Sequence, residues 1–167
     1  MIVDYKLGEY NIKVFPEGHT CYPKCLTRKG FISIGGLYNK KLEVVMIDDK
    51  NNILDRRGKV VLTKEDREYG REASNDFRAF KLGKYTILPV ICYEIYFPHI
   101  WKTVRHMVDK VHLIVNIVGR PMYNQNQVEK WRGLQLSMMS YYECDLVCAV
   151  GKGKGIDISG VIEWKNQ

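Results

Sequence analysis

The chain has 167 residues, with 26 lysines and arginines against 19 acidic residues, for a net charge of +7 at pH 7. This length and a hydrophobic fraction of 46% predict one globular domain with a sizeable core and exclude a disordered chain. The basic residues are scattered, so a solvated surface explains them better than a nucleic-acid site. The longest apolar run is too short to cross a bilayer and no signal peptide is evident, so we expect the chain in the cytoplasm, away from membranes.

The N-terminal part of the chain is predicted to form short strands joined by turns. Apolar, β-branched runs indicate strands over 11–15, 31–34, 42–47 and 53–56. The second of these is expected to end at Gly35-Gly36, and residues 48–52 form a hairpin-type turn before the fourth. Residues 1–10 are too polar to assign, and 18–29 shows no helical period. Thr63 can cap a short helix over 64–68, and 70–79 is predicted as a loop.

The second half alternates strands with two helices. Strands are predicted over 80–84, 85–91, 111–118, 146–150 and 156–162. Pro98 suits the first turn of a helix over 98–110, and apolar residues at helical spacing indicate a second helix over 126–142. Residues 119–126 are a loop, and the glycine-spaced 151–155 lacks the following helix of a phosphate loop. This alternation is typical of an α/β or a mixed layered α+β fold.

The cysteines argue against a metal site. Cys21/Cys25 and Cys144/Cys148 both have C-x3-C spacing and could together be imagined as zinc ligands. Structural zinc sites use tighter spacing with turn glycines, and the second pair lies in a strand-like apolar run, so we predict no metal. With Cys92 the count is odd, which leaves at least one free thiol and suits a reducing compartment.

Cys92 follows the predicted strand 85–91 directly, at the turn into the next helix. A thiol at such a turn is held rigidly, can be reached from a cleft and lies near backbone N–H groups that stabilise an anion. It could instead be a small buried core residue, as free cysteines often are. Glu17 and Lys59 also stand at strand ends, although each alone would be interpreted as a solvated charge.

These three residues, in this order and context, resemble the nitrilase, or carbon–nitrogen hydrolase, superfamily. The matching segments are Val14-Phe15-Pro16-Glu17, Gly58-Lys59-Val60-Val61-Leu62 and Ile91-Cys92-Tyr93-Glu94, with further likeness at Ile34-Gly35-Gly36, Tyr38-Asn39 and Tyr142-Glu143-Cys144. The resemblance runs from about residue 11 to residue 162. Each segment alone is a weak signal, whereas the ordered set is fairly specific.

The resemblance implies an α/β fold, a nitrilase-like layered α-β-β-α sandwich in one domain over residues 1–167. Relative to the family, we expect it to be shortened at the N-terminus and at the C-terminus. The helix that usually follows the first glutamate is expected to be reduced to the segment 18–29. Family members pair through helices beside the nucleophile, so a homodimer or higher oligomer is expected. The helix after Cys92, with Trp101 and Met107, would be its contact surface.

The resemblance also implies roles for individual residues. Cys92 would be the nucleophile, Glu17 the general base, and Lys59 with the backbone N–H of Tyr93 would stabilise the oxyanion. A second family glutamate near the pocket would be Glu65 or Glu68, of which Glu65 follows the pattern better. Glu143, at a predicted helix end, could be a surface charge or could lie at the pocket and orient Lys59, with structural support as its role at most.

The expected function is hydrolysis of an amide or nitrile of a small molecule through a cysteine thioester, with no cofactor. Two alternatives stay open. The shortened fold could be a catalytically inactive binding or assembly module. It could also be an acyltransferase of the same superfamily, although those that acylate lipoproteins have membrane spans that this sequence does not show.

Overall fold

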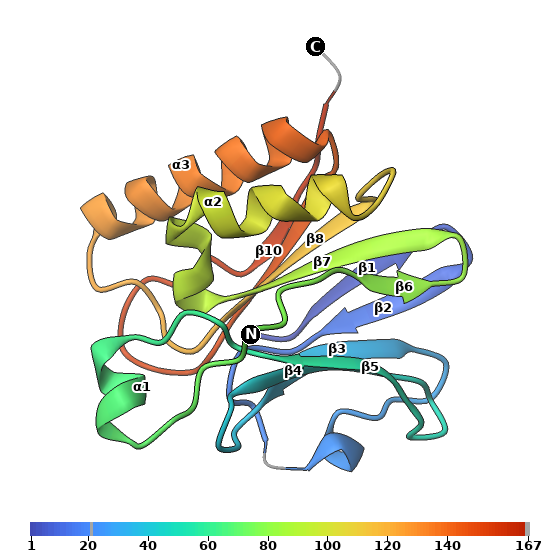
Figure 1. Cartoon of the computed structure of the whole chain (residues 1–167), viewed down its shortest axis with the longest axis horizontal. Coiled ribbons are helices and arrows are strands. Elements are labelled where there is room, and N and C mark those ends of the chain that lie inside the picture. The colour runs from blue at the N-terminus through green and yellow to red at the C-terminus, as the bar shows by residue number, and fades with distance from the viewer. Residues whose placement is uncertain (21, 166–167) are drawn as a thin grey trace.

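The computed structural model describes residues 1–20 and 22–165, which form two five-stranded sheets packed face to face (Figure 1). The first sheet has the order β1-β2-β3-β4-β5, with β1 Val3–Leu7, β2 Tyr10–Val14, β3 Ile32–Leu37, β4 Glu43–Ile47 and β5 Ile53–Gly58. The second has the order β10-β9-β8-β7-β6, with β6 Phe80–Leu82, β7 Tyr85–Ile91, β8 Leu113–Val118, β9 Asp145–Val150 and β10 Gly160–Ile162. Strands β7, β8 and β9 are mutually parallel.

Helices cover the outer face of the second sheet (Figure 1). They are α2 Pro98–Trp101, which continues as a 3₁₀ turn over Lys102–His106, and the long α3 Gln125–Tyr142. The short α1 Lys64–Glu68 follows β5 at one end of the sandwich. Because β7 and β8 are covered on both faces, they are apolar apart from the buried Thr86 and Asn116, as expected for strands of this kind.

Alternate residues of β7 serve two separate apolar cores. Ile87 and Ile91 point into the core between the sheets, whereas Leu88 and Val90 pack under the helices. This period of two is what a strand buried on both faces imposes. The two cores hold three layers together. They also fix the end of β7, which Cys92 follows directly.

The outer face of the first sheet carries a smaller apolar cluster in place of a helical layer. It consists of Phe15, Leu26, Leu37, Val45 and Ile47, all buried. The segment between β2 and β3, which contains only the 3₁₀ turn Pro23–Cys25, supplies Leu26 and covers this cluster. The architecture is the expected nitrilase-like α/β sandwich, shortened so that this segment stands in for the fourth, helical layer, in line with the expected reduction of 18–29.

Strand β3 continues through the two glycines that were predicted to end it. A Cβ on Gly35 would lie 2.7 Å from Cβ of Phe15, and one on Gly36 would lie 2.5 Å from Cα of Glu17. The absence of side chains lets the chain after β2 run close along β3, with Gly36 N–H donating to the Pro16 carbonyl at 3.2 Å. The glycine pair thus seats the backbone of Glu17 against the first sheet.

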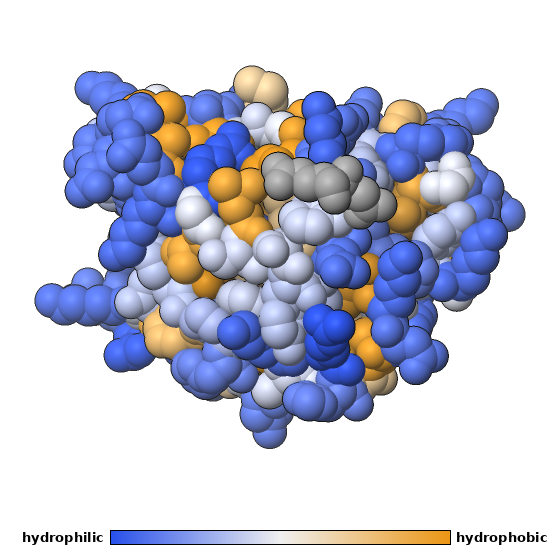
Figure 2. Space-filling model, turned by 90° about the horizontal axis from the view of Figure 1, so that it is seen from above, coloured by the Kyte–Doolittle hydropathy of each residue, from blue (hydrophilic) through white to orange (hydrophobic). Residues whose placement is uncertain are grey.

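The predicted helix 98–110 is wrong in length, and one of the two residues proposed for its contact surface is buried. Trp101 is only 2% exposed and belongs to the core under the helices, while Met107 is 64% exposed. Seen from above, the helix-covered face is mostly hydrophilic with separate apolar patches (Figure 2). A homodimer stays a prediction, without Trp101 in the interface.

Other expectations are met in part. Residues 1–10, left unassigned, include β1, and the predicted strand 156–162 is confined to β10 and an isolated pairing of Ile156 with Met122.

Cys144 and Cys148 are buried, and Cys21 lies outside the described residues. Within 1–20 and 22–165, no histidine, cysteine and carboxylate side chains gather as metal ligands, and no helix is long and apolar enough to cross a membrane.

Candidate active site

Glu17 is held where the chain leaves β2. The Phe15 N–H donates to the Ile34 carbonyl at 2.8 Å and the His19 N–H to the Gly36 carbonyl at 3.1 Å, so both sides of Glu17 are tied to β3. Its side chain is 11% exposed. A Cβ on Gly119 would lie 3.2 Å from Oε2 of Glu17, so the loop after β8 also closes on this carboxylate.

Lys59 follows β5 and its ammonium is buried between two carboxylates. Nζ lies 2.7 Å from Oε1 of Glu17 and 2.9 Å from Oδ2 of Asp66, and the side chain is 1% exposed. An ammonium carries three donors, and these two partners use two of them. One N–H of Lys59 therefore stays available within the described structure.

Asp66 is the functional candidate that sequence reasoning missed. It belongs to a capping box on α1, in which the Asp66 N–H donates to Oγ1 of Thr63 at 3.1 Å and the Thr63 N–H donates to Oδ2 of Asp66 at 2.8 Å. The box fixes the carboxylate that also accepts from Lys59. The signal was present in the sequence as Thr63 followed three residues later by an acid.

Cys92 is the first residue of a 3₁₀ turn over Cys92–Tyr96 that follows β7 directly. Its φ is 42°, in the left-handed region that a side chain rarely adopts, and its side chain is half-buried. Glu94 holds this turn, because its carboxylate accepts from the Ile91 N–H and from the Val60 N–H, each at 2.8 Å. Arg57 donates to the same carboxylate at 2.8 and 3.0 Å.

The charges at the site favour a neutral thiol beside a basic carboxylate. Burial raises the pKa of Cys92, and the charge of Glu17 adds to this, while Lys59 and the Gly119 N–H oppose it. Burial also raises the pKa of Glu17, against the lowering effect of Lys59. For Lys59, burial alone would lower the pKa, but Glu17 and Cys92 outweigh it and the pKa is raised. A carboxylate with a raised pKa is a stronger proton acceptor.

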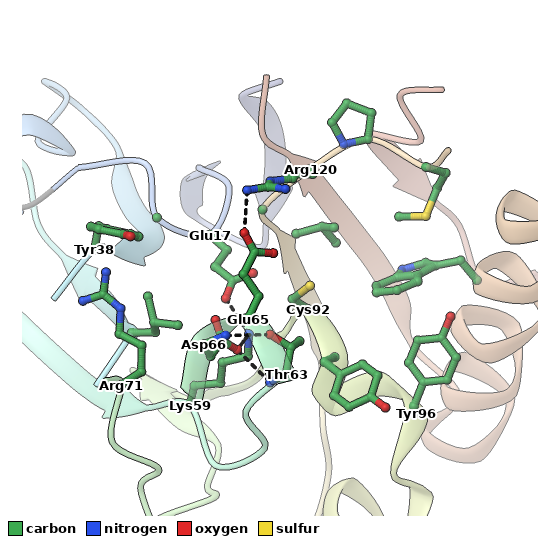
Figure 3. Close-up of a pocket in the computed structure, with 18 of the residues that line it drawn as sticks. Glu17, Tyr38, Lys59, Thr63, Glu65, Asp66, Arg71, Cys92, Tyr96 and Arg120 are labelled. Atoms are coloured by element: carbon green, nitrogen blue, oxygen red, sulfur yellow. Dashed lines mark hydrogen bonds and ion pairs between the residues drawn. The ribbon is translucent and has the colours of Figure 1, made fainter. Parts of the chain in front are cut away.

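Glu17, Lys59 and Cys92 line one pocket of about 540 Å³ (Figure 3). On the Cys92 side the wall is aromatic and apolar: Tyr93, Tyr96, Trp131 and Met122. On the other side lie Tyr38 and Arg71. Glu65 and Arg120, which also line the pocket, form an ion pair of 2.8 Å with both side chains at least half exposed (Figure 3).

The remaining predicted residues lie in different places. Glu65 lines the pocket but pairs with Arg120, and Glu68 is exposed beside Lys64 on α1. Tyr93 lines the pocket. Glu143 is an exposed residue at the left-handed C-cap of α3 and lies outside the pocket lining, so its assignment to the pocket is wrong.

No protein-family model and no curated protein sequence matches this chain. Solved structures do. An amidase from Nesterenkonia sp. AN1 matches at a TM-score of 0.68 and 13% identity, over 90% of this chain and 70% of the amidase. XC1258, a carbon–nitrogen hydrolase superfamily protein from Xanthomonas campestris, matches at 0.68 and 13%, over 90% of this chain and 69% of that one.

A mutant of the same Nesterenkonia amidase, described as a member of the nitrilase superfamily, also matches at a TM-score of 0.68. The chain has the nitrilase fold. A glutamine-dependent NAD⁺ synthetase from Acinetobacter baumannii matches this fold at 0.66 and 14% identity, over 84% of this chain but 31% of the synthetase. The chain thus spans about 70% of the length of the amidase and less than a third of the synthetase. In a mutant of the amidase, acrylamide has added to the active-site cysteine.

Proposed function

We propose that this protein hydrolyses an amide or nitrile carbon–nitrogen bond of a small molecule through a thioester on Cys92. The observation that carries the proposal is the 2.7 Å pair of Glu17 and Lys59 in the pocket that Cys92 lines. A thiol of raised pKa needs a neighbouring base, and Glu17 is a carboxylate of raised pKa. The same fold in an amidase with an active-site cysteine supports this chemistry.

The first half of the reaction forms the thioester from an amide. Glu17 takes the thiol proton while the sulfur of Cys92 attacks the carbonyl carbon. The carbonyl oxygen becomes an anion, which the unused N–H of Lys59 and the Tyr93 backbone N–H stabilise. The carbon–nitrogen bond then breaks, and the leaving nitrogen takes the proton back from Glu17.

The second half restores the enzyme. Water gives a proton to Glu17 and attacks the thioester carbon, the carbon–sulfur bond breaks, and the sulfur takes up the proton. The products are an acid and the free thiol. Lys59 keeps its charge throughout, because Asp66 favours the ammonium at every step and Glu17 does so whenever it is ionised.

The test combines turnover with intact-mass measurement. We expect ammonia release from small amides and a transient acyl adduct on the wild-type protein, both lost in Cys92→Ala. Cys25→Ala is the matched control, because Cys25 is an exposed free thiol outside the pocket. Glu17→Gln should suppress turnover while the fold persists.

The alternatives predict different results. An inactive binding module gives neither ammonia nor an adduct with any amide or nitrile, and this outcome would overturn the proposal. An acyltransferase forms the adduct but passes the acyl group to an added amine or alcohol much faster than to water.

A further inference from the structure

Arg71 is fixed in the wall of the pocket by its backbone and by its side chain. Its N–H donates to the Asp66 carbonyl at 3.0 Å, and the next residue, Glu72, donates to the Lys40 carbonyl at 2.9 Å. The guanidinium carbon lies 4.0 Å from the centre of the Tyr38 ring, and Nη1 donates to the Asn39 carbonyl at 2.7 Å. Arg71 is thus preorganised in the pocket wall, and its side chain is only half-buried.

Arg71 differs from the other pocket cations in having no carboxylate partner. Lys59 is paired with Glu17 and Asp66, and Arg120 is paired with Glu65. Among the residues that the structure describes, no acidic side chain forms an ion pair with Arg71. A guanidinium has five N–H donors, and the bond to Asn39 uses one of them.

An arginine that is held in place but has no acidic partner is suited to bind the carboxylate of a ligand. Its planar fork can donate two parallel N–H bonds to the two oxygens, and it stays charged at any working pH. The cation–π contact with Tyr38 positions the guanidinium without using its donors. The net charge of +7 also favours the approach of anions.

We propose that the pocket accepts amides that also carry a carboxylate, which Arg71 binds while the amide lies at Cys92. This inference rests on the proposed amide hydrolysis. Figure 3 shows Arg71 with Tyr38 on one side of the Glu17–Lys59 pair and Cys92 on the other, so such a substrate spans the pocket. The aromatic wall at Tyr96 lies beyond Cys92 and can contact the part of the substrate on the other side of the amide.

The test compares acidic and neutral amides of matched length. Monoamides of straight-chain dicarboxylic acids, from succinamate to pimelamate, are measured against the simple amides of the same chain length. We expect wild type to favour one acidic amide, and Arg71→Gln to lower the ratio of the two kcat/KM values by on the order of 10- to 100-fold, mainly through KM. Arg71→Lys should keep part of the preference.

Arg120→Gln/Glu65→Gln is the matched control, because it removes a cation of the pocket together with the carboxylate that balances its charge. Its ratio of kcat/KM values should stay close to that of wild type. If Arg71→Gln does not fold, Tyr38→Leu removes the stacked ring instead, and it should lower the same ratio. A preference that survives the Arg71 and Tyr38 changes, or one that is lost only in Arg120→Gln/Glu65→Gln, would overturn the proposal.

A binding measurement separates this proposal from the proposed reaction. Calorimetry on Cys92→Ala with glutarate and with neutral glutaramide needs no turnover. Binding of glutarate that weakens in Cys92→Ala/Arg71→Gln supports the carboxylate site even if no amide is hydrolysed. Equal binding of both compounds contradicts the carboxylate site and leaves the hydrolysis proposal standing on its own test.

Discussion

The buried pair of Arg57 and Glu94 allows the sharpest prediction about stability. Both side chains are fully buried, and two hydrogen bonds of 2.8 and 3.0 Å join them. Glu94 also accepts the N–H groups of Val60, next to Lys59, and of Ile91, next to Cys92. One carboxylate therefore connects the end of β5 with the turn that carries Cys92.

Glu94→Ala should lower the free energy of unfolding by at least about 3 kcal/mol. Removing one partner of a buried ion pair costs about 3–5 kcal/mol, because the other charge is left unpaired. The N–H groups of Val60 and Ile91 would also lose their acceptor, at about 1–3 kcal/mol for each buried group. Since a domain of this kind is stable by only about 5–15 kcal/mol, about a fifth or more of its stability is at stake.

Urea unfolding followed by fluorescence measures this change, with Glu143→Ala as the control because Glu143 is exposed. The control should shift stability by no more than about 0.5 kcal/mol. The double change Arg57→Met/Glu94→Leu should recover only part of the loss, because the two backbone N–H groups still lack an acceptor. A loss below about 1 kcal/mol in Glu94→Ala would refute the reasoning.

Three further predictions concern the pocket. Thr63→Ala removes the side-chain cap of α1 and should lower the free energy of unfolding by about 1 kcal/mol, measured in urea. The pKa of Glu17 is raised, and a general base must be ionised to accept a proton, so kcat/KM should fall as the pH decreases through a value above 4.5. A pH profile in which kcat/KM falls only at or below pH 4.5 would contradict this. Glu65→Gln breaks an exposed pair with Arg120 and should change stability by less than about 1 kcal/mol in thermal unfolding.

Local patterns predicted the elements whose signals lie within a few residues. The run 85–91 is strand β7 with the same bounds, and Thr63 caps a helix over 64–68 as expected. In these places β-branched and apolar residues or a capping side chain decide the backbone without distant partners. The pocket residues Glu17, Lys59 and Cys92 were selected because their segments together resemble the nitrilase superfamily, and the two sheets bring them to one pocket.

Elements that depend on distant contacts were missed. Strand β1 alternates buried and exposed residues over only five positions, and the Tyr5 hydroxyl donates to Asp145, 140 residues away. The helix predicted over 98–110 changes to a 3₁₀ turn after Trp101. There the hydroxyl of Tyr142, from α3, donates to the Trp101 carbonyl that a continuing α-helix would use. Tyr142 is 41 residues from Trp101 in the sequence, so no local sequence pattern could predict this end of the helix.

The pocket is assembled from both sheets, and this affects how any loss of activity is interpreted. Glu17 and Lys59 follow strands of the first sheet, whereas Cys92 follows β7 of the second. Their alignment therefore depends on the core between the sheets and on Glu94, which touches no reacting atom in the proposed mechanism. A change in either can abolish turnover without removing a catalytic group. Only a variant such as Glu17→Gln, with unaltered unfolding and a lost pH limb, would assign a catalytic role.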